Sequence, residues 1–172
     1  MPSQPHGGRL VQIRQAAIDS DSFDGFSGTS KLRIDAETQK TIWNIGSGVF
    51  SPLEGFMGEG DFVNVIDEMR LESDIPWTLP ILLTTDHVEV ARAGSRLLLT
   101  DEADMPIAVM DCEGTYHFDR KEYSRKVFGT EDVAHPGVAK VCGGPETAAA
   151  GRLKLVARPD YGPYAESTLN PR

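Results

Sequence analysis

The histidines, cysteines and carboxylates of this sequence are the side chains that could bind a metal ion, so their spacing is decisive. The histidines and cysteines are scattered along the chain: His6, His87, His117, His135, Cys112 and Cys142. A structural zinc site needs about four ligands, usually in closely spaced pairs, and the sequence has no such pairs. The acidic run from Asp101 to Asp104 suits a hard cation and a solvated hairpin tip equally well. We predict no metal site and two reduced thiols.

Phosphate binding is the other chemistry to consider, because glycine-rich loops and cationic side chains hold ATP in nucleotidyl-transfer enzymes. The pattern G-x-x-x-x-G-K-[ST] does not occur, and Gly46, Gly48 and Gly55 do not complete a G-x-G-x-x-G motif. From Gly48 to Met57, apolar residues alternate with turn residues, which favours a packed turn. We predict that the chain contributes no catalytic residue and no cofactor-binding residue.

Two helices in the first half of the chain are predicted from capping residues and apolar periodicity. Asp35 is expected to cap a helix that runs through Ile45 and that Gly46 and Gly48 end. The second helix, over residues 60–70, has an apolar stripe at i, i+3, i+4 and i+7. That stripe consists of Phe62, Val65, Ile66 and Met69. We expect this helix to pack on a core.

A third helix and several short strands are predicted further along. Asp119, with Glu122 three residues later, forms a variant of the capping box, and Gly129 closes the helix that it opens. Apolar or alternating runs bounded by turn residues indicate strands. These runs are Ile81–Leu83, Arg96–Thr100, Pro106–Met110 and Arg152–Ala157.

Three segments read as irregular. Met1–Gly8 is expected to be an extended arm that is ordered by docking, and the segment from Ser20 to Ser30 is expected to be a surface loop. After Arg158 the chain has three prolines and no periodicity, as linkers do. We therefore predict a domain over residues 1–158, with residues 1–8 as its arm, and a linker over residues 159–172.

The predicted elements do not repeat in strand–helix–strand order, which argues against a doubly wound nucleotide-binding sheet. Short strands with about three helices favour an α+β fold, mainly β. The expected architecture is a small mixed or antiparallel β-barrel with helices on its rim.

Two stretches of sequence carry a resemblance to a known family. The segment from Asn44 to Leu83, NIGSGVFSPLEGFMGEGDFVNVIDEMRLESDIPWTLPILL, resembles the N-terminal domain of ATP sulfurylase (sulfate adenylyltransferase). The segment from Val127 to Val141, VFGTEDVAHPGVAKV, is similar to the same family further along. The opening Pro5-His6-Gly7-Gly8 resembles the start of the dissimilatory and archaeal branch. The resemblance thus covers nearly the whole chain and implies a PUA-like barrel.

The resemblance implies a parent enzyme that transfers the adenylyl group of MgATP to sulfate. The family's catalytic motifs, Gln-x-Arg-Asn, His-x-x-His and Gly-Arg-Asp, are not matched. The nearest approach is residues 12–15, where Gln15 replaces the asparagine, and Val138 follows His135-Pro136-Gly137 where a second histidine would stand. The chain is therefore expected to be an inactive scaffold that binds no cofactor, with MgATP as a substrate of the parent.

The partner implied by the resemblance is a C-terminal catalytic domain of the same enzyme, in a homo-oligomer. Pro136 holds His135 in an extended conformation, and Gly137 allows a close backbone approach. We therefore predict a loop here. Together with the N-terminal arm, this loop is expected to form the contact with the catalytic domain or a neighbouring subunit. Their residues are His6, Gly7, Gly8, His135, Pro136 and Gly137.

The composition restricts the other partners. With 26 acidic and 17 basic residues the formal net charge is -9, which repels nucleic acids and anionic membranes. No apolar run approaches the roughly 20 residues that span a bilayer, and the N-terminus lacks the apolar core of a signal peptide. A soluble, cytoplasmic protein is expected. Two alternatives remain: a stand-alone PUA-like RNA-binding module, and a regulatory domain acting on a separate catalytic subunit.

Overall fold

The computed structural model describes residues 4–13, 29–156, 162–167, 169 and 171. The chain divides into two compact units. Unit 1 is made of Met1–Gly55, Ser95–Asp111 and Arg152–Arg172, and unit 2 of Phe56–Gly94 and Cys112–Gly151.

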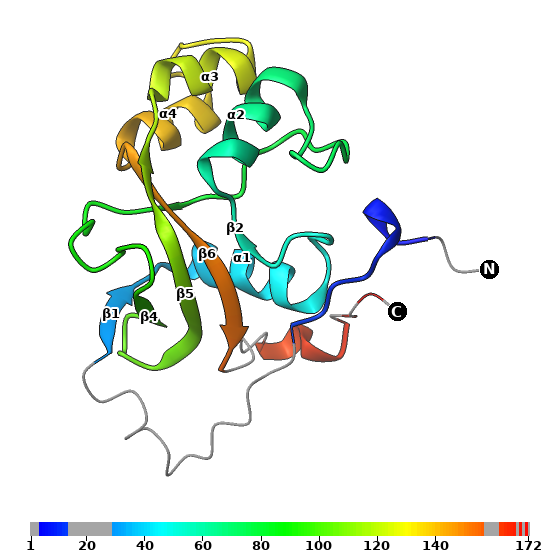
Figure 1. Ribbon diagram of the computed structural model, residues 1–172, viewed down its shortest axis with the longest axis vertical. Coiled ribbons are helices and arrows are strands. Elements are labelled where there is room, and N and C mark those ends of the chain that lie inside the picture. Colours follow the sequence, from blue (N-terminus) through cyan, green and yellow to red (C-terminus); the bar gives the residue numbers. More distant parts are fainter. Residues whose placement is uncertain (1–3, 14–28, 157–161, 168, 170, 172) are drawn as a thin grey trace. The chain divides into compact units, whose positions relative to one another are not determined.

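Six strands form one mixed sheet in the order β1-β4-β5-β6-β2, with β3 paired to β6 (Figure 1). Their bounds are β1 Ser30–Arg33, β2 Gly55–Phe56, β3 Leu83–Thr84, β4 Arg96–Thr100, β5 Pro106–His117 and β6 Thr147–Leu155. β1 runs parallel to β4, whereas β4–β5 and β3–β6 are antiparallel. The α+β class is confirmed. The sheet that was expected to form a barrel is not closed: within the described residues, no hydrogen bonding joins the two end strands, β1 and β2.

Helix α1 (Ala36–Ser47) supplies the helical part of the core of unit 1. The Asp35 carboxylate accepts a hydrogen bond from the Thr38 amide at 2.7 Å, and Gly48 ends the helix in the left-handed conformation at φ 93°. The predicted cap at Asp35 and the stop at Gly48 are therefore confirmed, but the helix runs two residues beyond the predicted Ile45. Gly46 was expected to help end the helix but lies inside it, where a side chain would collide with Leu155 of β6. Ile45, beside it, is fully buried.

The N-terminal segment is tied to the end of α1. The Val11 amide donates to the Ser51 hydroxyl at 2.9 Å, and that hydroxyl donates to the Gly48 carbonyl at 2.7 Å. The Ile13 amide donates to the Gly46 carbonyl at 2.8 Å. Just before this anchor, η1 (His6–Gly8) is a short 3-10 turn. The described part of the predicted extended arm is thus partly turned, because two glycines with positive φ allow it.

The β4–β5 connection is a hairpin whose tip is the acidic run Asp101–Asp104. The Asp101 carboxylate accepts hydrogen bonds from the amides of Ala103 and Met105 at 2.9 and 2.8 Å. Asp104 adopts a φ of 60° and forms an ion pair with Arg33 at 2.9 Å. Turn formation therefore accounts for this run of carboxylates.

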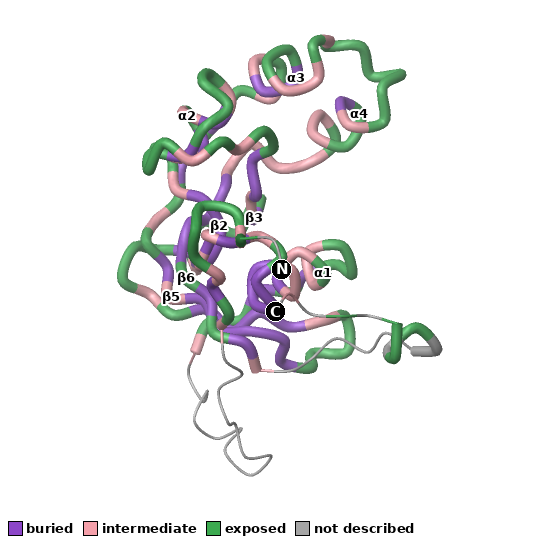
Figure 2. The backbone as a smooth tube through the Cα atoms, turned by 90° about the vertical axis from the view of Figure 1, so that its right-hand side faces the viewer, coloured by how far each residue is buried: buried purple, intermediate pink, exposed green. Residues whose placement is uncertain are grey.

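In unit 2, three helices pack side by side: α2 (Glu59–Glu68), α3 (Arg120–Phe128) and α4 (Pro136–Gly143), with α3 in contact with both others (Figure 1). Their shared core is an aromatic cluster in which Phe62 is central. Its ring lies 5.6 Å from Tyr116, 5.4 Å from Phe118 and 6.0 Å from Tyr123. Figure 2 shows that most of α3 and α4 is exposed or half-buried. The buried residues are Tyr123 and Ser124 in α3 and Val138 in α4, and Tyr123 belongs to the aromatic cluster.

The structure changes several predicted boundaries. α2 ends at Glu68, two residues before the predicted end, and Met69 takes a left-handed conformation with 61% of its surface exposed. β5 continues to His117, and β6 begins at Thr147 rather than Arg152. The strand expected over residues 81–83 is Leu83–Thr84.

Two segments predicted as irregular contain helices in the structure. Pro136 and Gly137 belong to α4, and η3 (Gly162–Ser167) lies in the predicted linker. Proline fits the first turn of a helix, where its missing N–H has no partner to lose. Most of the predicted Ser20–Ser30 loop falls outside the described residues, although Ser30 itself begins β1.

Candidate functional site

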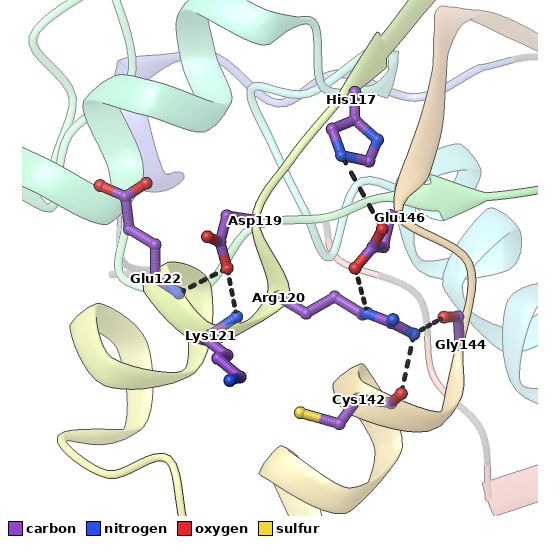
Figure 3. Close-up of polar contacts among 8 residues, drawn as sticks. All are labelled: His117, Asp119, Arg120, Lys121, Glu122, Cys142, Gly144 and Glu146. Atoms are coloured by element: carbon purple, nitrogen blue, oxygen red, sulfur yellow. Dashed lines mark hydrogen bonds and ion pairs between the residues drawn. The ribbon is translucent and has the colours of Figure 1, made fainter.

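The most elaborate group of polar contacts in unit 2 surrounds Arg120 at the start of α3 (Figure 3). Its Nε donates to the Glu146 carboxylate at 2.8 Å. Its Nη1 donates to the carbonyls of Cys142 and Gly144 at 2.8 and 2.7 Å. His117 Nε2 lies 3.8 Å from the other oxygen of Glu146. We call these five residues the Arg120 cluster.

The local sequence explains why the guanidinium lies there. The Asp119 carboxylate caps α3 by accepting hydrogen bonds from the amides of Lys121 and Glu122 at 2.7 and 3.1 Å. These hydrogen bonds stabilise the charged carboxylate and so hold the pKa of Asp119 below its usual value. The hydrogen bond from the Glu122 amide contributes most, and that from the Lys121 amide is second. Arg120 is the first helical residue, where a cation is unfavourable to the helix dipole. Its side chain reaches instead to the carbonyls at the end of α4, where a cation is favourable.

Two cavities adjoin the Arg120 cluster, with volumes of about 510 and 460 Å³, and both are lined by His117, Arg120 and Glu146. The larger one also contacts Lys121 and Cys142. Carboxylates line both cavities beside the cations. An anionic ligand would therefore meet Glu146 and its neighbours as well as the guanidinium. The geometry favours a structural role, in which Arg120 joins the start of α3 to the turn between α4 and β6.

The candidate ligands considered from the sequence are not gathered into a metal site. Among the described residues no group of three or more His, Cys, Asp or Glu side chains could hold a metal ion. Cys112 is buried in β5, whereas Cys142 is half-buried at the cavity. His87 pairs with Glu89 at 3.4 Å.

Two tyrosines of the aromatic cluster are held in their neutral form by burial. Desolvation raises the pKa of Tyr123 to about 12. The same cause raises the pKa of Tyr116 well above its usual value, helped by the nearby Glu59 and Asp61. The Tyr116 hydroxyl donates to the Met57 carbonyl at 3.2 Å. These hydroxyls belong to the core of unit 2.

The predicted contact residues lie on the surfaces of the two units. His6, Gly7 and Gly8 are exposed in unit 1. In unit 2, His135 and Pro136 are exposed, and the His135 ring lies 5.1 Å from that of Phe128. Residues 12–15 are the nearest approach to the family's Gln-x-Arg-Asn motif, and Arg14 and Gln15 lie outside the described residues. The side-chain amide of Gln12 donates to the carbonyls of Ser47 and Pro171 at 3.3 and 3.1 Å.

Sequence reasoning did not single out Arg120, although one signal was available. An arginine directly after a predicted N-cap is misplaced with respect to the helix dipole and needs a nearby carboxylate or carbonyl. Its partners, at Cys142, Gly144 and Glu146, are more than 20 residues away in the sequence. No local pattern could therefore name them.

Among the described residues, no helix is both long and apolar enough to cross a bilayer.

Comparisons with known proteins agree with the fold. A PUA-like domain family matches residues 3–158. The hexameric APS kinase from Thiobacillus denitrificans has a similar structure, with a TM-score of 0.67 over 97% of this chain and 29% of that chain. At 21% sequence identity this similarity concerns the fold alone.

Three curated relatives share the name sulfate adenylyltransferase. A sulfate adenylyltransferase of Hyperthermus butylicus is 42% identical across 100% of this chain and 44% of its own length. That of Cenarchaeum symbiosum is 40% identical across 91% of this chain and 40% of its own length. The Pyrococcus abyssi protein is 38% identical, over 99% of this chain and 45% of that protein. The chain therefore spans less than half the length of these relatives.

Together, the family match over most of the chain and the archaeal relatives confirm the resemblance found in the sequence. The chain belongs to the PUA-like domain family, in the form that occurs within proteins named sulfate adenylyltransferase.

Proposed function

We propose that this chain is the N-terminal PUA-like domain of a sulfate adenylyltransferase and that it supports a catalytic part outside these 172 residues. In the reaction of that parent enzyme, a sulfate oxygen attacks the α-phosphorus of MgATP. The new S–O–P linkage gives adenosine 5'-phosphosulfate, and pyrophosphate leaves. MgATP and sulfate are substrates of the catalytic part, in the cytoplasm.

The observation that carries this proposal is the unequal coverage between the chain and its relatives. The Hyperthermus butylicus relative aligns with 100% of this chain but with 44% of its own length. The PUA-like match, over residues 3–158, occupies nearly all of the chain. More than half of that relative therefore corresponds to nothing in this sequence, and we assign the catalytic groups to that part.

The Arg120 cluster is consistent with a supporting role. A site for triphosphate needs converging cations and backbone amides that are free to bind phosphate. Here the Arg120 guanidinium is already engaged with Glu146 and two carbonyls. Carboxylates surround the adjoining cavities. The cluster stabilises the domain rather than a transition state.

An assay of pyrophosphate release tests the proposal. The isolated 172-residue chain, given MgATP and sulfate, is expected to show no turnover above background. The longer protein that contains it is expected to turn over at an enzyme-like rate. Sulfate-dependent turnover by the isolated chain would contradict the scaffold role, and an inactive longer protein would contradict the proposed parent reaction.

The predicted contact residues belong to the same proposal. We assign His6–Gly8 and His135–Gly137 to the contact with the catalytic part or with a neighbouring subunit of a homo-oligomer. Both segments are largely exposed, which leaves them accessible. Replacing His135 and Pro136 in the longer protein should lower its thermal stability or its oligomer mass.

The control for this experiment is the same replacement in the isolated chain. There, the packing of His135 on Phe128 and the proline at the start of α4 are lost, but no contact with a catalytic part is involved. Equal destabilisation of both proteins, with an unchanged oligomer mass, would assign His135 a purely internal role.

A further inference from the structure

The segment from Met69 to Leu79, which we call the 69–79 hairpin, carries large apolar side chains on the surface of unit 2. Met69 is 61% exposed and Leu79 is 47% exposed. Trp77 connects them: its amide donates to the Met69 carbonyl at 2.8 Å, and its indole Nε1 donates to the Leu79 carbonyl at 2.8 Å. Methionine and tryptophan are enriched in the cores of protein interfaces. In its residue types, the 69–79 hairpin therefore resembles the core of a protein–protein interface.

Several hydrogen bonds hold the hairpin in one conformation. The Leu71 amide donates to the Ile75 carbonyl at 2.9 Å, and the Asp74 amide donates to the Leu71 carbonyl at 2.9 Å. The Arg70 guanidinium donates to the Asp74 carbonyl at 2.7 Å. Leu71 is buried and anchors the hairpin to the unit. Because the loop is already ordered, binding through it would cost little conformational entropy.

Met69 is in an unusual backbone conformation for an exposed residue. It ends α2 with φ 54° and ψ 39°, in the left-handed region. Glycine is the usual residue at such a position, because a side chain there costs about 1 kcal/mol. With 61% of its surface exposed, the Met69 side chain gains little from packing against the part of the chain that the structure describes. A contact outside that part would account for methionine here.

The charges around the hairpin restrict the partner. Four carboxylates lie in its first part and just before it; they are Asp67, Glu68, Glu72 and Asp74. Arg70 pairs with Asp74, and Lys126 of α3 pairs with Asp67, so the carboxylates still outnumber the cations. A second copy of this chain would carry the same carboxylates and the same formal net charge of -9, so the two copies would repel each other at this surface. Nucleic acid would be repelled for the same reason. The complementary partner is a protein surface with an apolar centre and basic residues around it.

We propose that the 69–79 hairpin docks onto the catalytic part of the same longer protein, with Met69, Trp77 and Leu79 at the centre of the contact. This inference rests on the function proposed above. Because the hairpin is flanked by an excess of carboxylates, charge complementarity requires basic residues around the surface that it contacts. The hairpin would thereby hold unit 2 against the half of the enzyme that performs the chemistry.

Photo-crosslinking in the longer protein tests this docking. p-Benzoylphenylalanine is placed at Leu79 and, in separate proteins, at two exposed control positions of unit 2. Val88 is 44% exposed, close to the exposure of Leu79, and Val133 is 65% exposed on the alternative surface near His135. The expected product is a species of monomer mass in which residue 79 is joined to a peptide from outside residues 1–172. Its yield should be clearly higher than that at Val88, because only a residue held against the partner crosslinks efficiently.

Other products would overturn the proposal. A species of twice the monomer mass would identify a second copy as the occupant. Equal yields at Leu79 and Val88, or crosslinking confined to Val133, would place the contact elsewhere. A Met69→Gly variant adds a second measurement, because amide exchange of residues 70–79 in the longer protein should accelerate by about tenfold when a central contact is removed. Unchanged exchange would count against docking.

Failure of this docking can be told apart from failure of the proposed function. Crosslinking detects the contact and does not require the enzyme to turn over. Sulfate-dependent pyrophosphate release by the unmodified longer protein measures the reaction. An active enzyme without the crosslink would refute only the hairpin inference. A crosslinked but inactive protein would refute only the assigned reaction.

Discussion

The two units have cores of different chemistry. Unit 1 is built around aliphatic residues of adjacent strand positions, with Leu97, Leu98 and Leu99 of β4 all buried. Unit 2 is built around aromatic rings from α2, β5 and α3, with Phe62 at the centre. The buried leucines of β4 form one continuous run in the sequence, whereas the aromatic cluster is assembled from distant segments. The buried strand can be recognised locally and the aromatic cluster cannot.

The largest expected effect is at the centre of the aromatic core. Phe62→Ala removes a ring that contacts three others, and a buried phenylalanine-to-alanine change costs about 3–5 kcal/mol of unfolding free energy. Urea unfolding followed by fluorescence measures the loss. Its neighbour Val63 is 42% exposed, so Val63→Ala is the control and should stay within about 0.5 kcal/mol. Similar losses for the two variants would show that the cluster is not a core.

Arg120 tests how far unit 2 depends on a charged link. The comparable group in unit 1 is Asp111, which pairs with Arg96 at 2.8 Å and with Lys154 at 2.7 Å. Its side chain is 31% exposed, and hydrogen bonds to charged groups contribute about 1.5–3 kcal/mol. Arg120→Ala should therefore lower the unfolding free energy by about that amount. Arg120→Lys should recover only part, because an ammonium cannot reproduce the planar arrangement of donors.

Arg125 provides the matched control for this link. It lies on the same helix and pairs with Glu131 at 3.4 Å, with 62% of its side chain exposed. Exposed ion pairs contribute little, so Arg125→Ala should leave the urea midpoint nearly unchanged. A loss as large as that of Arg120→Ala would mean that general surface charge, rather than the Arg120 cluster, stabilises unit 2.

Two helical glycines sharpen the comparison of packing in the two units. In unit 1, a Cβ on Gly46 would lie 2.7 Å from Leu155 Cγ, inside the core, so Gly46→Ala should cost about 1–3 kcal/mol. In unit 2, a Cβ on Gly60 would meet the exposed Glu72 carboxylate, which can move aside. Gly60→Ala should then be neutral or stabilising by up to about 1 kcal/mol. The thermal unfolding midpoints of the two variants test this difference. Equal destabilisation by Gly46→Ala and Gly60→Ala would show that the two glycines are packed equally tightly.

The smallest effect is the pH dependence of the α3 cap in unit 2. The folded-state pKa of Asp119 is lowered by hydrogen bonds from the amides of Glu122 and Lys121. Its contribution is therefore complete above the unfolded pKa of about 3.9 and is lost as the pH falls through the lower folded value. Asp119→Asn keeps a capping acceptor but cannot titrate, so its urea midpoint should change less as the pH falls from about 5 through the unfolded pKa of about 3.9 and below it. An unchanged slope would show that other carboxylates dominate.

Local rules predicted the elements with strong capping or apolar signals. Asp35 and Asp119 cap α1 and α3, and Gly48 and Gly129 end them, because these residue types satisfy backbone groups within a few residues. β4 was predicted with its full bounds, Arg96–Thr100. These features depend on neighbours in the sequence, which is why they could be recognised without the structure.

The remaining elements depend on distant partners. Residues 147–151, TAAAG, form the first part of β6 although alanine favours helices, because Ala148 and Ala149 pair with β3. α4 begins at Pro136 in a segment that its proline and glycine marked as a loop, and Gly137 lies close against the Phe128 ring. The partners of Arg120 come from a segment more than 20 residues away. No local pattern contains this information.

The anchor between the N-terminal segment and the end of α1 has a practical consequence for engineering. Val11 and Ile13 give their amide hydrogens to Ser51 and Gly46, and Gly48 leaves just enough room for the Val11 carbonyl. An affinity tag fused ahead of Met1 leaves these bonds in place. Trimming the polypeptide up to Gln12 would break the bond at the Ser51 hydroxyl and open the end of α1 to solvent, so tagged, untrimmed versions are the ones suited to purification and crystallisation.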